Sequence, residues 1–103
     1  STTAIMALGG KGVISVAANV VPREMHELTQ LCLKNRFLEA GTLQLKLHEL
    51  IRALFREVNP IPVKAAMAEL GLCGGELRLP LCTISDRNLP RLTRAMQDFG
   101  VTV

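Results

Sequence analysis

The stretch that decides the fold is GGKGVISVAANV, residues 9–20. Three glycines surround Lys11, and an apolar, partly β-branched run begins at Val13. Glycines beside a lysine can form a phosphate-binding loop, but that loop follows a strand and precedes a helix. The dinucleotide-binding fingerprint has the same order. Here the glycines come first, so we expect residues 9–12 to lead the chain into a strand and not to hold a phosphate.

The apolar run after the glycines is too short for a helix. It is typical of a strand that is buried on both faces in a parallel sheet. Side chains alternate along a strand, so Ile14 and Val16 share one face. A single strand cannot form a sheet, because its backbone N–H and C=O groups need neighbouring strands. The strand therefore pairs with another chain, or the sequence is part of a larger α/β protein.

The remaining pattern predicts helices. Apolar residues at helical spacing place them over residues 2–8, 22–35, 37–58, 63–70 and 89–99. Pro22 suits the first turn of the second helix, and Ser85 or Asn88 could cap the last one. The prolines of NPIP, residues 59–62, predict an extended segment between the third and fourth helices.

Composition excludes several classes of protein. The chain has 103 residues, 49% of them hydrophobic, which is enough for one small globular domain. No apolar run approaches the length of about 20 residues that a membrane span needs. The net charge of +3 is spread along the chain and aromatic residues are scarce, which argues against nucleic-acid binding. The first residues read as the last turns of a helix that belongs to something longer.

The cysteine and histidine pattern gives no metal site. Cys32, Cys73 and Cys82 form no CxxC pair, and His26 and His48 are far apart. We expect reduced, mostly buried thiols, a cytoplasmic location, and no metal or cofactor.

No complete catalytic site can be assembled from the residues either. Lys11 lies in a glycine loop without an apolar wall, and Lys64 near a helix start is typical of an exposed lysine. The chain has no tyrosine and no GxSxG motif.

Four motifs in the same order carry a family resemblance. GGKGVISVAANV, NPIPVK, ELG and LRLPL together resemble the C-terminal part of the dihydrodipicolinate synthase family, which is also named 4-hydroxy-tetrahydrodipicolinate synthase and belongs to the N-acetylneuraminate lyase superfamily. The resemblance covers essentially the whole chain. It implies an α/β fold, the C-terminal part of a TIM (β/α)8 barrel plus a helical C-terminal extension. Residues 1–36 would hold the end of helix 7, strand 8 (13–18) and helix 8 (22–35), and residues 37–103 the extension.

The resemblance also implies a reaction. Family members are lyases that condense pyruvate with aspartate semialdehyde in lysine biosynthesis, through a Schiff base on a lysine of the sixth strand. That lysine and a proton-relaying tyrosine would lie before Ser1, so we expect no catalytic residue in this chain and no activity from it alone. Ile14 and Val16 would line the pyruvate pocket. Leu8 would lie where family members make a dimer–dimer contact in a homotetramer.

Three departures and two alternatives accompany the resemblance. The segment VKAAM, residues 63–67, lacks the aromatic residue that the family often has after the lysine. Ala17 and Cys82 stand where the family commonly has threonine. The chain could instead belong to another pyruvate-dependent aldolase of the superfamily. It could also be a non-enzymatic helical interaction module, which would be a stable and monodisperse small protein.

Overall fold

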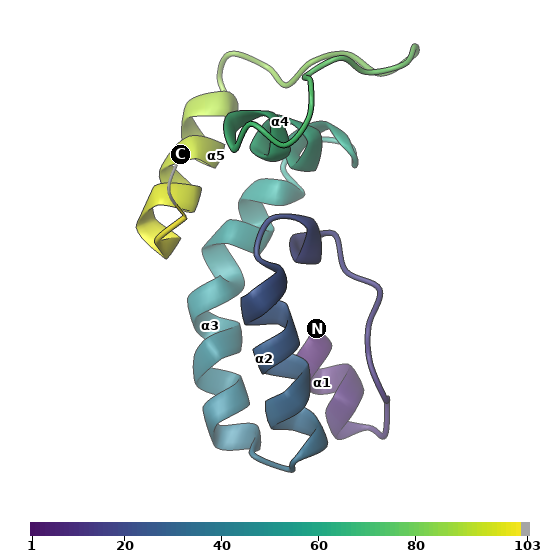
Figure 1. The fold of residues 1–103 in the computed structure, drawn as a ribbon, viewed down its shortest axis with the longest axis vertical. Coiled ribbons are helices and arrows are strands. Elements are labelled where there is room, and N and C mark those ends of the chain that lie inside the picture. Colours follow the sequence, from purple (N-terminus) through teal and green to yellow (C-terminus); the bar gives the residue numbers. More distant parts are fainter. Residues whose placement is uncertain (102–103) are drawn as a thin grey trace. The chain divides into compact units, whose positions relative to one another are not determined.

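The computed structural model describes residues 1–101, which form five α-helices and one 3-10 helix (Figure 1). The chain divides into two compact units, Ser1–His48 and a second unit that begins at Glu49. The long helix α3 (Phe37–Leu54) contributes its first part to one unit and its last turns to the other.

The first unit is built around α2 (Pro22–Leu33). Both α1 (Thr2–Ala7) and the 3-10 helix η1 (Ala17–Asn19) pack on α2. Helix α1 is also tied to α3, because the backbone N–H and Oγ1 of Thr3 donate to Gln44 Oε1 at 3.3 and 3.1 Å. The buried apolar side chains of this unit are Met6, Ala17, Val20, Val21, Met25, Leu28, Cys32, Ala40 and Leu47.

A short connection turns the chain from α2 into α3. Helix α2 ends at Leu33, and Asn35 takes a left-handed conformation with φ of 59°. Asparagine is one of the few residues that tolerate this region. Arg36 then forms an ion pair of 2.7 Å with Glu39 in the first turn of α3. Figure 1 shows α2 and the first part of α3 running in opposite directions after this turn.

The second unit contains the end of α3, α4 (Ile61–Glu69) and α5 (Leu89–Phe99), and α4 packs against α5. Residues 70–88 connect these two helices without regular structure and run out and back as a long loop (Figure 1). Helix α5 ends at Gly100, whose φ of 105° suits a residue without a side chain. The buried apolar side chains here are Leu50, Ala53, Leu54, Ile61, Val63, Ala66, Leu92 and Met96.

Residues 13–18, where the sequence predicts a strand, form no strand in this chain by itself. Residues 10–15 have no regular structure, residues 17–19 form η1, and no strand occurs among residues 1–101. Within this part of the chain, no backbone N–H of residues 11–15 donates a hydrogen bond to another backbone group. A strand exists only with a neighbour that accepts and donates those hydrogen bonds. The described residues supply none, so the apolar run remains extended without becoming a strand.

The predicted helices are confirmed with shifted ends. Helix α3 ends at Leu54, earlier than expected, and α4 begins at Ile61, earlier than the NPIP motif suggested. Pro62 lies in the first turn of α4, where the missing N–H of a proline has no helical partner to lose. The expectation of mostly buried thiols is wrong, since Cys73 and Cys82 are exposed on the long loop and only Cys32 is buried.

Candidate functional site

The glycine turn after α1 directs the chain into the extended residues. Gly9 has a φ of 104°, a conformation that side chains rarely adopt. The N–H groups of Gly9 and Gly10 donate to the carbonyls of Met6 and Ile5, each at 3.1 Å. A Cβ on Gly10 would lie 2.9 Å from Ile5 Cγ2 and 3.0 Å from the Ile5 carbonyl oxygen, so this position has no room for a side chain. Two of the glycines thus serve backbone geometry.

The far end of the segment is held by η1. Ser15 Oγ accepts a hydrogen bond of 3.3 Å from the Ala18 N–H, and Asn19 Nδ2 donates to the Val16 carbonyl at 3.2 Å. The side chains of Ala17 and Val20 are buried beside α2. Residues 11–15 are therefore fixed at both ends while their backbone between the ends is open to a partner.

The structure places the predicted site residues on and beside this segment. Ile14 is fully exposed and Val16 is half-buried at the start of η1. Leu8 is 90% exposed at the C-terminal end of α1. The exposure of Leu8 and Ile14 leaves two large apolar side chains, on either side of the glycine turn, available to a further surface.

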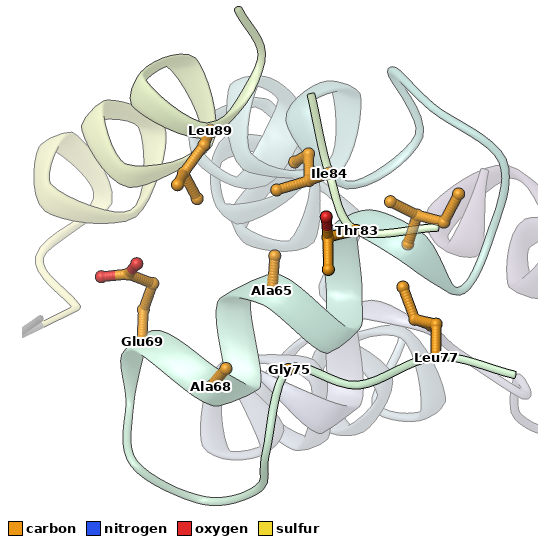
Figure 2. A pocket seen from close by; sticks show the side chains of 9 residues that line it. Ala65, Ala68, Glu69, Gly75, Leu77, Thr83, Ile84 and Leu89 are labelled. Atoms are coloured by element: carbon orange, nitrogen blue, oxygen red, sulfur yellow. The ribbon is translucent and has the colours of Figure 1, made fainter. Parts of the chain in front are cut away.

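A hollow of about 160 Å³ lies in the second unit between α4, the long loop and the start of α5 (Figure 2). Figure 2 shows Ala65 of α4 and Leu89 of α5 directed toward each other across it, with Ile84 of the loop beside them. Glu69 is the one ionisable side chain among its lining residues. A single carboxyl group in an apolar lining supports packing and gives no set of groups for acid–base chemistry.

The sequence analysis missed a carboxylate cluster that fastens the long loop. Glu57 Oε2 accepts hydrogen bonds from Asn88 Nδ2 at 2.7 Å, Ser85 Oγ at 2.8 Å and the Ser85 N–H at 3.1 Å. Hydrogen bonds from Asn88 first and Ser85 next lower the pKa of Glu57, because they stabilise its charged form. Asn88 lies at the N-cap of α5 as expected, but its side chain bonds Glu57 in place of the helix backbone. Nothing in the local sequence links residues this far apart.

The described residues contain neither a candidate metal site nor a membrane-spanning helix. Within residues 1–101, no group of three or more His, Cys, Asp or Glu side chains could hold a metal ion. No helix in the same part of the chain is long and apolar enough to cross a membrane.

Comparison with known proteins places this arrangement in a family. The model of the dihydrodipicolinate synthetase family matches residues 1–99. The chain belongs to this family. Its alignment with the family covers the glycine turn, the extended segment, and every helix described above.

Relatives within the dihydrodipicolinate synthetase family are similar over almost the whole chain. The 4-hydroxy-tetrahydrodipicolinate synthase of Methanocaldococcus jannaschii is 47% identical over 100 residues, which are 97% of this chain and 35% of the relative. The structure of dihydrodipicolinate synthase from Aquifex aeolicus is 46% identical, with a TM-score of 0.95 over 97% of this chain and 34% of its own. The chloride-inhibited enzyme of Acinetobacter baumannii, solved with pyruvate, is 38% identical, with a TM-score of 0.94 over 97% of this chain and 34% of its own.

The chain thus spans about a third of the length of the dihydrodipicolinate synthases that it matches. That share and the match in structure confirm the predicted fold class, a mostly helical C-terminal portion of such an enzyme. The match to this family of synthases also argues against the alternative of a non-enzymatic interaction module.

Proposed function

We propose that this chain forms the C-terminal portion of a 4-hydroxy-tetrahydrodipicolinate synthase, a lyase that condenses pyruvate with aspartate semialdehyde in lysine biosynthesis. The observation that carries the proposal is the similarity of nearly the whole chain to a third of such synthases, at 47% identity in the Methanocaldococcus jannaschii relative. The Acinetobacter baumannii relative, solved with pyruvate, supports pyruvate as one substrate.

In this proposal residues 13–18 complete a TIM barrel as its eighth strand. Support comes from the backbone of residues 11–15, whose N–H groups have no backbone acceptor among residues 1–101. Neighbouring strands of a barrel would supply those acceptors on both edges. Residues 1–36 would then belong to the barrel, and residues 37–103 to the helical extension.

Ile14 and Val16 would form part of the wall of the pyruvate pocket. Their separation by one residue places both side chains on one face of a strand. The full exposure of Ile14 supports this role, because an apolar side chain in open solvent gains free energy when another surface covers it. Neither side chain can transfer a proton, so both would shape the pocket while other groups perform the chemistry.

The reactive groups would come from outside this chain. The sequence has no tyrosine, and Lys11 is exposed on the open glycine segment. An imine-forming lysine needs a desolvated pocket or a positive neighbour. The chain alone should therefore form no Schiff base with pyruvate. The complete protein would be a cytoplasmic homo-oligomer, a tetramer or a dimer, in which exposed Leu8 contributes to a subunit contact.

A chimera tests the proposal. The upstream two-thirds of the Methanocaldococcus jannaschii relative would be joined to this chain, and the condensation of pyruvate with aspartate semialdehyde would be measured. We expect an active enzyme, trapping of the pyruvate adduct by borohydride in the chimera, and no trapping on this chain alone. A folded chimera without activity, or an adduct on the isolated chain, would refute the proposal.

Variants of the chimera test the pocket wall. Ile14→Asp should raise KM for pyruvate, because a carboxylate would repel the substrate carboxylate. Leu38→Asp is the matched control, since Leu38 is 91% exposed on α3 and lies outside the proposed pocket. Equal effects of the two substitutions would remove Ile14 from the pocket.

A further inference from the structure

A second hollow, of about 250 Å³, lies between the last turns of α3 and one face of α5. Helical spacing explains the lining residues of α5 and the two of α3, because residues three, four and seven positions apart share a helix face. The hollow is formed by Glu49 and Ala53 of α3, by Arg56 in the turn that follows, and by Arg91, Arg94, Ala95 and Asp98 of α5.

The charges in this hollow are unbalanced. It contains three guanidinium groups and two carboxylates. Glu49 contacts Arg52 at 3.5 Å and Asp98 contacts Arg94 at 3.8 Å, and all four side chains are largely exposed. Such long, solvated ion pairs hold their partners weakly.

Two of the three arginines have no anionic partner within the part of the chain that the structure describes. Across residues 1–101, the guanidinium groups of Arg56 and Arg91 form no ion pair and no hydrogen bond with another side chain. Both line the same hollow, Arg56 from the turn after α3 and Arg91 from α5. Each offers a planar set of N–H donors that matches two oxygens of a carboxylate or a phosphate.

Small side chains leave space between these arginines. Ala53 is 3% exposed, and Ala95 is half-buried beside it in the lining. Larger residues at these two positions would occupy the volume that a ligand needs. The hollow thus combines room, two small apolar side chains, and arginines that line it from two sides.

We propose that this hollow binds a small oxyanion with two or more negative charges, either a phosphate or a dicarboxylate. Arg56 and Arg91 would hold the oxyanion from opposite sides. Arg94 would donate a further hydrogen bond when it leaves its ion pair with Asp98. The site lies in the second unit and is independent of the proposed synthase activity, so either proposal can fail without the other.

Isothermal titration calorimetry of the chain tests the site. Sodium phosphate and sodium succinate would each be titrated in, with sodium chloride at equal ionic strength as the reference. We expect saturable binding of phosphate, of succinate or of both, and none of chloride. The oxyanion that binds more tightly identifies the ligand class. Absence of saturable binding by both oxyanions, or equal binding of chloride, would overturn the proposal.

Four variants separate a built site from general surface charge. Arg56→Gln and Arg91→Gln should each weaken binding about tenfold, because each removes a charge-assisted hydrogen bond. Asp98→Asn should tighten binding, since it removes a competing carboxylate. Ala95→Leu should abolish binding although every arginine is retained. Arg78→Gln, at an exposed position outside the hollow, is the control and should change nothing. If Arg78→Gln weakens binding as much as Arg56→Gln, or if Ala95→Leu has no effect, the hollow is not the site.

Discussion

Asn88 Nδ2 donates a hydrogen bond of 2.7 Å to Glu57 Oε2, which ties the start of α5 to the turn after α3. Ser85 reinforces this contact through its hydroxyl and its backbone N–H. Because residues 70–88 have no regular structure, this cluster fixes where the long loop returns to the folded part of the second unit.

Replacement of Glu57 tests the contribution of this cluster. Glu57→Gln should lower the free energy of unfolding by about 1 kcal/mol at neutral pH, because the amide accepts hydrogen bonds more weakly than a carboxylate. Urea unfolding followed by circular dichroism measures the change. Glu69→Gln is the control, since the Glu69 side chain is exposed and makes no hydrogen bond or ion pair within residues 1–101. An equal loss in both variants would contradict the role of Glu57.

The same cluster predicts a dependence of stability on pH. The pKa of Glu57 is lowered in the folded chain, so the charged form is favoured by folding. The contribution is complete above the unfolded pKa, and is lost as the pH falls through the folded pKa. The parent chain should therefore be more stable than Glu57→Gln at neutral pH, and this difference should shrink as the pH falls through the folded pKa of Glu57. A difference that persists in acid would show that the substitution acts through packing.

The glycine-rich segment predicts opposite results for substitutions at Gly9 and Gly12. Gly9→Ala should destabilise the first unit by about 1–2 kcal/mol, because an alanine at a φ of 104° is strained. Gly12→Ala should be neutral or stabilise by up to about 1 kcal/mol, since a Cβ there meets nothing within 4 Å. Thermal unfolding of both variants checks this, and destabilisation by Gly12→Ala as large as that by Gly9→Ala would contradict the turn geometry.

The three thiols report on folding of the two units. Cys73 and Cys82 should react rapidly with a thiol reagent in the native chain, because both are exposed, whereas Cys32 should react only after denaturation. Kinetics with Ellman's reagent measure this, and Cys73→Ser or Cys82→Ser should each remove one rapid equivalent. Equal rates at all three thiols would mean that the core around α2 does not form.

Exposed apolar residues predict self-association. Leu8 and Ile14 expose large side chains beside residues 11–15, whose N–H groups have no backbone acceptor among residues 1–101, and this favours association between copies. Sedimentation velocity should show species larger than the 11.2 kDa chain, and Ile14→Asp should reduce them. Gln97→Glu adds a charge on exposed α5 and is the control. A monodisperse parent chain would count against an uncovered apolar segment.

The sequence by itself determined the helices and the family. Apolar residues at helical spacing placed α2, α4 and α5 to within a few residues, because each helix satisfies its own backbone and needs only one buried face. Four motifs in a fixed order identified the family, which the match over residues 1–99 then confirmed. The position of the glycines before the apolar run predicted a turn into an extended segment, and Gly9 and Gly10 form that turn.

Tertiary structure alone decided the rest. Residues 13–16 have the composition of a strand, yet hydrogen bonds between strands come from segments outside the strand, and the described chain supplies none. The cluster of Glu57, Ser85 and Asn88 and the arginine hollow join residues from separate helices and loops. Periodicity describes one element at a time, so contacts between elements appear only when the chain is packed.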